Sequence, residues 1–193
     1  MMSNDRCGLT ASVIHGAKSK TRRIASRVVR QWDIAEELTG ILGNPTQREL
    51  TLKEFALKVC PIKVGEVIAQ PYKTLIEQGY LCRESDGYVS EEYCATPGYH
   101  NKMFVKAEYM PVRIKITGVD FEHLQDISDE DCLAEGIMYD PKGVAKYGYR
   151  IGEGKSKWYR TPKDAFSSLI DKVSGKGTWD SNPYVYVFTF KLS

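Results

Sequence analysis

The segment HGAKSKTRR, residues 15–23, places a lysine and a threonine three residues apart among further basic side chains. A threonine hydroxyl can attack an acyl group once a neighbouring base has removed its proton. An ordinary lysine is protonated at pH 7, so Lys18 can act on Thr21 as that base only if burial or nearby positive charge favours its neutral form. Lys20, Arg22 and Arg23 would supply such charge. Three interpretations follow: a solvated basic turn, a phosphate-binding loop, or a reactive pair.

Charge is unevenly distributed along the chain, although the formal net charge is only +2. Basic residues are frequent among the first thirty residues, where Asp5 is the only acid. Acids are frequent in DISDEDCLAEG, residues 126–136. The total is too small to indicate a nucleic-acid-binding protein, but the separation of the two signs predicts a local electric field.

Cysteine usage and hydropathy indicate the compartment. The five cysteines are odd in number and include no CxxC pair, which is typical of reduced thiols in a cytoplasmic protein. Cys82, Cys94 and His100 lack the spacing of a structural zinc site, so we expect no metal and no other cofactor. The first sixteen residues are too polar for a signal peptide, and no run approaches the roughly 20 apolar residues of a membrane span. We therefore expect no membrane association.

The N-terminal half predicts short elements. LTASVI, residues 9–14, is predicted as a strand that ends at Gly16, and apolar spacing from Ile24 predicts a helix. Thr51 and Glu54 form a capping box at the start of a second helix, which must end before Pro61. VGEVI, residues 64–68, is predicted as a turn followed by a strand.

The C-terminal half is more regular. VRIKITGVDFEHL, residues 112–124, predicts either a pair of strands or one long strand bent at Gly118. Ser128 is predicted to cap a short helix that ends at Gly136. Thr161 is predicted to cap a longer helix that ends before Gly175, and the last strand, apolar on both faces, should be central in its sheet. Residues 72–101 are expected to form a loop or a hairpin, and residues 138–157 a surface loop. The pattern predicts one α+β domain, a small mixed β-barrel with surrounding helices.

Three blocks of the sequence together resemble a known family. They are IHGAKSKTRR, then VGEVI, and finally MPVRIKITGVDFEHLQDISDEDCLAEGI together with DAFSSLIDKVSGKGTWDSNPYVYVFTFKL. This combination is similar to the ASCH domain, a branch of the PUA-like β-barrel superfamily, and in particular to its phage and prophage members. If the chain is phage-encoded, its compartment is the host cytoplasm. The resemblance implies one domain over residues 1–193, with insertions at 24–59, 72–101 and 138–157.

The resemblance also implies an activity. ASCH proteins are regarded as RNA-binding or RNA-modifying, and one bacterial branch hydrolyses N4-acetylcytidine with a lysine, a threonine and a glutamate. The pattern Gly-x-Lys-x-x-Thr-x-Arg places the first two on Lys18 and Thr21, and the position after the short acidic helix indicates Glu135. One departure is that many members carry an Arg-Glu pair after the Val-Gly-Asp strand, where this chain has QPYK, residues 70–73.

Our working hypothesis is a Thr-Lys-Glu site at one mouth of the barrel that binds RNA or a modified pyrimidine nucleoside. Glu135 would orient Lys18 or give a proton to the leaving 4-amino group. Tyr109 or Trp179 would stack on the base. Lys20, Arg22 and Arg23 would bind the nucleic acid.

Alternatives remain at this stage. The same basic face could serve a non-catalytic single-stranded RNA-binding module, which needs cations for phosphates and aromatic rings for bases. The tyrosine-rich insertions could instead bind a host protein, with the fold as a scaffold only. Trp179 could be a core residue, and Glu135 could simply precede the helix stop at Gly136.

Overall fold

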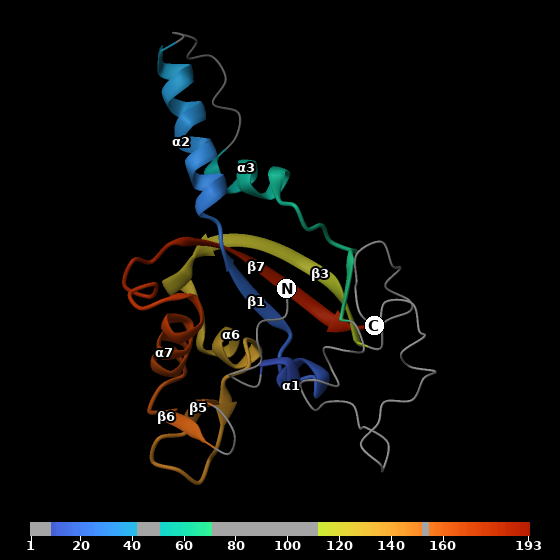
Figure 1. Ribbon diagram of the computed structural model, residues 1–193, viewed down its shortest axis with the longest axis vertical. Coiled ribbons are helices and arrows are strands. Elements are labelled where there is room, and N and C mark those ends of the chain that lie inside the picture. The colour runs from blue at the N-terminus through green and yellow to red at the C-terminus, as the bar shows by residue number, and fades with distance from the viewer. Residues whose placement is uncertain (1–8, 42–50, 71–111, 152–154) are drawn as a thin grey trace, which may run out of the picture.

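The computed structural model describes residues 9–41, 51–70, 112–151 and 155–193, which form a mixture of helices and strands (Figure 1). The elements are α1 (Leu9–Ile14), β1 (Lys20–Ile24), α2 (Ser26–Ile41), α3 (Leu52–Val59), β2 (Val67–Gln70), β3 (Val112–His123), the 3₁₀ turn η2 (Leu124–Asp126), α6 (Asp129–Ala134), β4 (Met138–Tyr139), β5 (Tyr147–Arg150), β6 (Ser156–Tyr159), α7 (Pro162–Ser174) and β7 (Tyr184–Leu192). The predicted α+β class is confirmed. The described strands form two antiparallel sheets and do not close into a barrel.

The larger sheet has the order β1-β7-β3-β2, and every neighbouring pair is antiparallel. β7 lies in its centre, as its apolar side chains on both faces predicted. The register of β3 against β7 shifts between Ile116 and Gly118, which confirms the predicted irregularity at that glycine.

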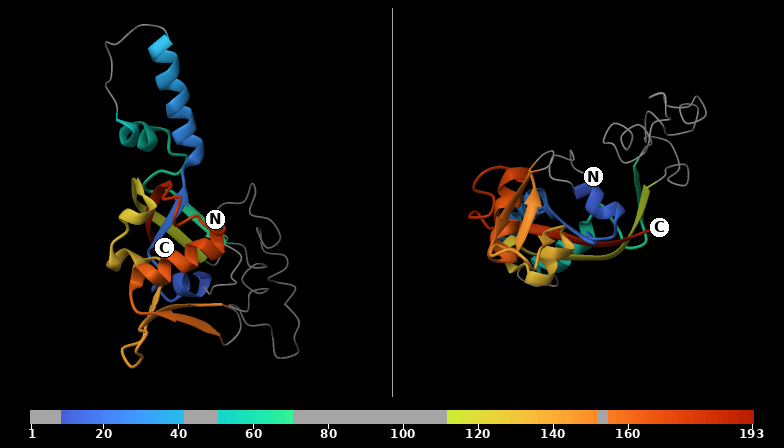
Figure 2. Two further views of the ribbon diagram at one scale, coloured as in Figure 1. Left: turned by 90° about the vertical axis from the view of Figure 1, so that its left-hand side faces the viewer. Right: turned by 90° about the horizontal axis from the view of Figure 1, so that it is seen from below.

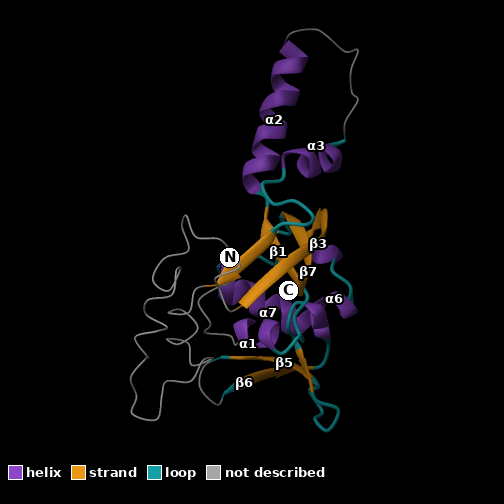
Figure 3. Cartoon of the chain, turned by 90° about the vertical axis from the view of Figure 1, so that its right-hand side faces the viewer, coloured by secondary structure: helices purple, strands orange, loops and turns teal. Residues whose placement is uncertain are grey.

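The two faces of this sheet carry separate cores. Val185 and Val187 of β7 pack with residues of α6 and α7, whereas Tyr186 and Phe188 pack with residues of α1, α2 and α3. This division follows from the period of two along a strand. Figure 3 shows α2 and α3 beyond one end of the sheet, with α6, α7 and the smaller sheet toward the other. α2 projects from the body in Figure 1 and in the left-hand view of Figure 2.

Three predicted helix starts are confirmed by their caps. Thr51 and Glu54 bond reciprocally at the start of α3, and the Ser128 hydroxyl accepts the backbone N–H of Asp131 at the start of α6. Thr161 caps α7, whose first residue is Pro162, and the helix ends before Gly175. None of the helices in these described segments combines the length and the apolar character that a membrane crossing needs.

Two predictions were wrong. Residues 9–14 form helix α1 rather than a strand, and the helix ends at Ile14. Gly16 follows with a φ of 72°, a left-handed conformation, and its N–H donates to the Val13 carbonyl. Residues 138–157, expected to be a surface loop, contain β4, β5 and the start of β6. The side chain of Tyr149 explains this order, because it is buried in the core with α7 and its hydroxyl bonds to Ser168. Residues 72–101 and Tyr109 lie outside the described residues.

The smaller sheet depends on a close approach at Gly148. A Cβ atom at this position would lie 2.4 Å from the Lys157 carbonyl oxygen and 2.8 Å from the Trp158 ring, too close for either to remain in place. We expect Gly148→Ala to lower the free energy of unfolding by about 1–3 kcal/mol, the usual cost of overpacking. Urea unfolding measures this loss of unfolding free energy. Gly118→Ala is the control, because a Cβ atom at Gly118 would lie an ordinary 3.4 Å from Thr189. Equal losses in the two variants would contradict this explanation.

Candidate functional site

Lys18 and Glu135, which are 117 residues apart, form a buried ion pair. The Lys18 Nζ lies 2.7 Å from Glu135 Oε2 and 2.6 Å from the Glu135 backbone oxygen. The two side chains are only 9% and 5% exposed. Both of these oxygens of Glu135 therefore accept hydrogen bonds from the Lys18 side chain.

The local chain explains how these residues meet. The Lys18 N–H donates to the Ser12 carbonyl, and the next N–H, of Ser19, donates to the Ala134 carbonyl at 2.9 Å. This second bond holds the segment before β1 against the end of α6. Glu135 is the C-cap of α6, and Gly136 follows with a φ of 103°, a left-handed conformation that ends the helix. The last turn of α6 therefore presents both the carbonyl and the carboxylate of Glu135 to Lys18.

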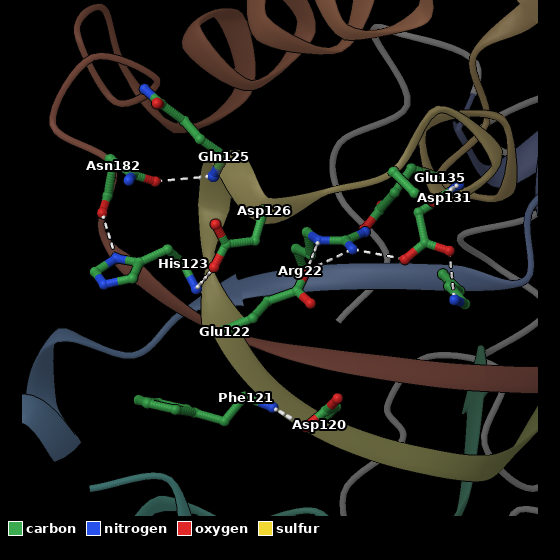
Figure 4. A network of polar contacts seen from close by, with 12 residues as sticks. Arg22, Asp120, Phe121, Glu122, His123, Gln125, Asp126, Asp131, Glu135 and Asn182 are labelled. Atoms are coloured by element: carbon green, nitrogen blue, oxygen red, sulfur yellow. Dashed lines mark hydrogen bonds and ion pairs between the residues drawn. The ribbon is translucent and has the colours of Figure 1, made fainter.

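Arg22 of β1 joins Glu135 to two further carboxylates (Figure 4). Its Nη1 donates to Glu135 Oε1 at 3.3 Å, and its Nη2 donates to Asp131 Oδ2 at 2.7 Å and to Glu122 Oε1 at 2.6 Å. The Arg22 side chain is 1% exposed. Burial disfavours its charge, but the hydrogen bonds to Asp131 and Glu122 outweigh that effect, and the pKa of Arg22 is raised.

Lys20 completes the group through an ion pair with Asp131. We call these residues the ionic cluster: Lys18, Lys20, Arg22, Glu122, Asp131 and Glu135. Its three cations face three carboxylates, so their formal charges cancel. A phosphate group would have to displace a carboxylate to reach Arg22. The prediction that Lys20 and Arg22 bind nucleic acid stays a prediction, and for Arg22 the burial of the guanidinium opposes it.

Thr21 lies on the other side of the sheet from this cluster. In the register with β7, Arg22 is opposite Val187 and Thr21 is opposite Phe188, and these two partners belong to the two different cores. Side chains of paired residues share a face, so Thr21 and Arg22 face opposite sides of β1. Among the described residues, the Thr21 hydroxyl makes no hydrogen bond to Lys18 or Glu135. The structure thus brings two of the three predicted catalytic residues together.

The remaining predicted site residues have different surroundings. Arg23 is on the same face as Thr21, and burial lowers the pKa of its guanidinium, partly offset by the charge of Glu135. Trp179 packs edge-to-face on Phe166 at 6.2 Å between ring centroids, and its backbone N–H donates to Asp171. Trp179 therefore occupies the position expected of a core residue.

Sequence reasoning did not identify Glu122 and Asp131 as site residues. Asp131 is 109 residues from Arg22 in the sequence, and Glu122 is 100 residues from it. The signal for Glu122 is the register: it pairs with Val185, two residues from the Arg22 partner Val187, and so shares a face with Arg22. That register is visible only when the strands are paired.

The described segments hold no group of three or more histidine, cysteine or acidic side chains arranged to bind a metal ion. Comparison of the chain with protein-family models, with curated proteins and with solved structures gave no match.

The ionic cluster predicts a pH-dependent stability. Burial opposes ionisation of Asp131, but hydrogen bonds from Lys20 and Arg22 outweigh it, so the pKa of this carboxyl is lower in the folded protein than in the unfolded chain. The stabilisation is complete above the unfolded pKa of about 3.9 and is lost as the pH falls through the lower folded pKa. We expect Asp131→Asn to cost about 1.5–3 kcal/mol at pH 7 and progressively less below about pH 4.

Urea unfolding of both proteins from pH 7 to pH 3 measures this difference. Asp129→Asn is the matched control, because Asp129 is exposed in the same helical turn. A difference between wild type and Asp131→Asn that stays constant with pH would show that Asp131 contributes through packing and not through its charge.

Proposed function

We propose that the protein binds a modified pyrimidine nucleoside, free or within RNA, and hydrolyses an N4-acyl amide of cytidine with Lys18 and Glu135. The observation that carries this proposal is the buried contact of 2.7 Å between these two side chains. They occupy the positions that the resemblance to the ASCH domain assigns to the lysine and the glutamate. Membership of the PUA-like superfamily is part of the same proposal.

The energetics of burial support a functional role for the pair. Removing a charge from water costs several kcal/mol per ion, and an apolar pair of similar volume often stabilises a core as well or better. The ionic cluster buries three such groups, since Lys18, Arg22 and Glu135 are all in the interior. Interior ionisable groups with specific charged partners are concentrated at functional sites.

The pair has the two properties that amide hydrolysis requires. The Glu135 carboxylate accepts a proton from a water molecule, whose oxygen attacks the acyl carbon. The Lys18 ammonium donates a hydrogen bond to the oxygen that becomes negative in the tetrahedral intermediate. The C–N4 bond then breaks, the proton on Glu135 passes to the 4-amino group, and cytidine and the carboxylic acid are released. Arg22, bonded to Glu135 Oε1, keeps this carboxylate in place.

Water is the nucleophile in this proposal because Thr21 faces the opposite side of β1. The burial of Arg22 opposes its use in RNA binding, because a phosphate-binding surface needs exposed cations and Arg22 is 1% exposed with three carboxylate partners. Lys20, which is 30% exposed, is the cation of the cluster that a phosphate could reach.

Incubation with N4-acetylcytidine, and separately with a single-stranded RNA oligonucleotide that contains it, tests the proposal. We expect cytidine and acetate from at least one of the two, measured by liquid chromatography after nuclease digestion of the oligonucleotide. Unmodified cytidine provides the chromatographic baseline. Release from neither substrate would overturn the proposal, and release from only one would identify the form in which the base is recognised.

A further inference from the structure

A second candidate site lies on the face of the large sheet that is turned away from the ionic cluster. A hollow of about 710 Å³ is bounded by the first half of α2, by α3 with the segment after it, and by β7. β7 contributes Tyr186 and Phe188. These side chains belong to the core with α1, α2 and α3, on the other face of the sheet from Val187. Pockets that enclose small organic ligands have volumes of about 300–1,000 Å³. The hollow has room for such a ligand.

Part of the apolar lining of the hollow is aromatic. Phe55 of α3 and Tyr186 and Phe188 of β7 contribute rings, and the other apolar lining residues are Ile24, Ala25, Val28, Val59, Pro61 and Ile62. Rings of this kind favour a planar partner, since aromatic pairs gain energy beyond the area they bury. This part of the hollow fits an aromatic group.

The polar part of the hollow is cationic. Arg23, Arg27 and Gln31 line it, and none of the lining residues that the structure describes is acidic. Arg27 and Gln31 are four residues apart on α2 and so lie on one face of that helix. Arg27 is also in the first turn of α2, where the helix dipole carries partial positive charge. Two guanidinium groups and a helix N-terminus together attract an anion, and guanidinium groups match carboxylate and phosphate geometry.

We propose that this hollow binds an organic anion in which a carboxylate or phosphate is attached to an aromatic body. The anionic group contacts Arg23 and Arg27, and the ring packs among Phe55, Tyr186 and Phe188. This inference does not depend on amide hydrolysis, because the hollow and the ionic cluster lie on opposite faces of the sheet.

Isothermal titration calorimetry with two probes tests the proposal and distinguishes two sources of the same chemistry. 1-Naphthoate represents an aromatic carboxylic acid, and cytidine 5′-monophosphate represents a nucleotide. Inorganic phosphate carries only the anionic group, and 1-naphthalenemethanol carries only the aromatic group. We expect at least one probe to bind at least tenfold more tightly than inorganic phosphate and 1-naphthalenemethanol do.

Two substitutions locate the binding. Arg27→Ala removes a cation and should weaken the bound probe at least tenfold, whereas Ile62→Trp fills the apolar part and should abolish binding. Arg30→Ala is the matched control, because Arg30 is on the same helix but does not line the hollow. If Ile62→Trp does not fold, as judged by circular dichroism, Val59→Trp replaces it at a more exposed lining position.

The outcomes separate clearly. Binding of 1-naphthoate alone, weakened by both substitutions, would identify an aromatic acid site, and binding of the nucleotide alone would identify a nucleotide site. Binding of neither probe would overturn the proposal, as would binding that both substitutions leave unchanged. Amide hydrolysis is measured separately, so its failure would leave this result unaffected.

Discussion

Replacement of Arg22 by methionine is expected to lower the free energy of unfolding by about 3–5 kcal/mol, the usual cost of removing one partner from a buried ionic group. Methionine retains most of the packing volume but leaves the carboxylates of Glu122, Asp131 and Glu135 without their shared guanidinium. Of these, Glu135 is 5% exposed, so water cannot replace the lost hydrogen bond freely. Urea unfolding at pH 7, monitored by circular dichroism, measures the loss.

Two matched variants separate charge from geometry. Lys20→Met removes an ion pair to the same Asp131, but the Lys20 side chain is 30% exposed, so we expect a loss of at most about 1 kcal/mol. Arg22→Lys retains the charge but cannot donate to three carboxylates in a planar fork, and its loss should be intermediate. If Arg22→Met were no more destabilising than Lys20→Met, the buried cluster would not be the feature that joins β1, β3 and α6.

The helix caps and the central strand show which parts of the structure could be predicted from sequence. Local signals were sufficient for the helix caps at Thr51, Ser128 and Thr161, because each cap is a bond between residues three apart in the chain. The central position of β7 followed from its apolar character on both faces. The errors occurred where distant contacts decide the outcome. Tyr149, for example, orders β5 through Ser168, nineteen residues away.

The candidate site was predictable only in part for a related reason. The resemblance identified Lys18 and Glu135, and the structure brings them together. Residues 20–24 were not predicted as a strand, so the alternation that separates Thr21 from Arg22 was not applied. Strand pairing also determines which acids face Arg22, and no local pattern encodes the pairing of β1 with β7 or of β7 with β3.

Substitution of Glu135 by glutamine should reduce kcat/KM for N4-acetylcytidine by about 10²–10⁴-fold, the range associated with loss of a general base. The amide has nearly the same size and can still accept a hydrogen bond from Lys18, but it cannot take a proton from water. Lys18→Met should cause a loss of about 10²–10³-fold through the missing donor to the tetrahedral intermediate. Cytidine release followed by chromatography gives both values, and circular dichroism establishes that each variant is folded.

Thr21→Val distinguishes the two possible nucleophiles. Valine has the shape of threonine without the hydroxyl, and the side chain faces the core with Phe188, so we expect less than a tenfold change if water attacks the amide. If the Thr21 hydroxyl were the nucleophile, the variant would lose nearly all activity, as removal of a covalent nucleophile does. An inactive Thr21→Val protein together with an active Glu135→Gln protein would therefore reverse the assignment. It would require residues 18–21 to adopt another conformation when substrate is bound.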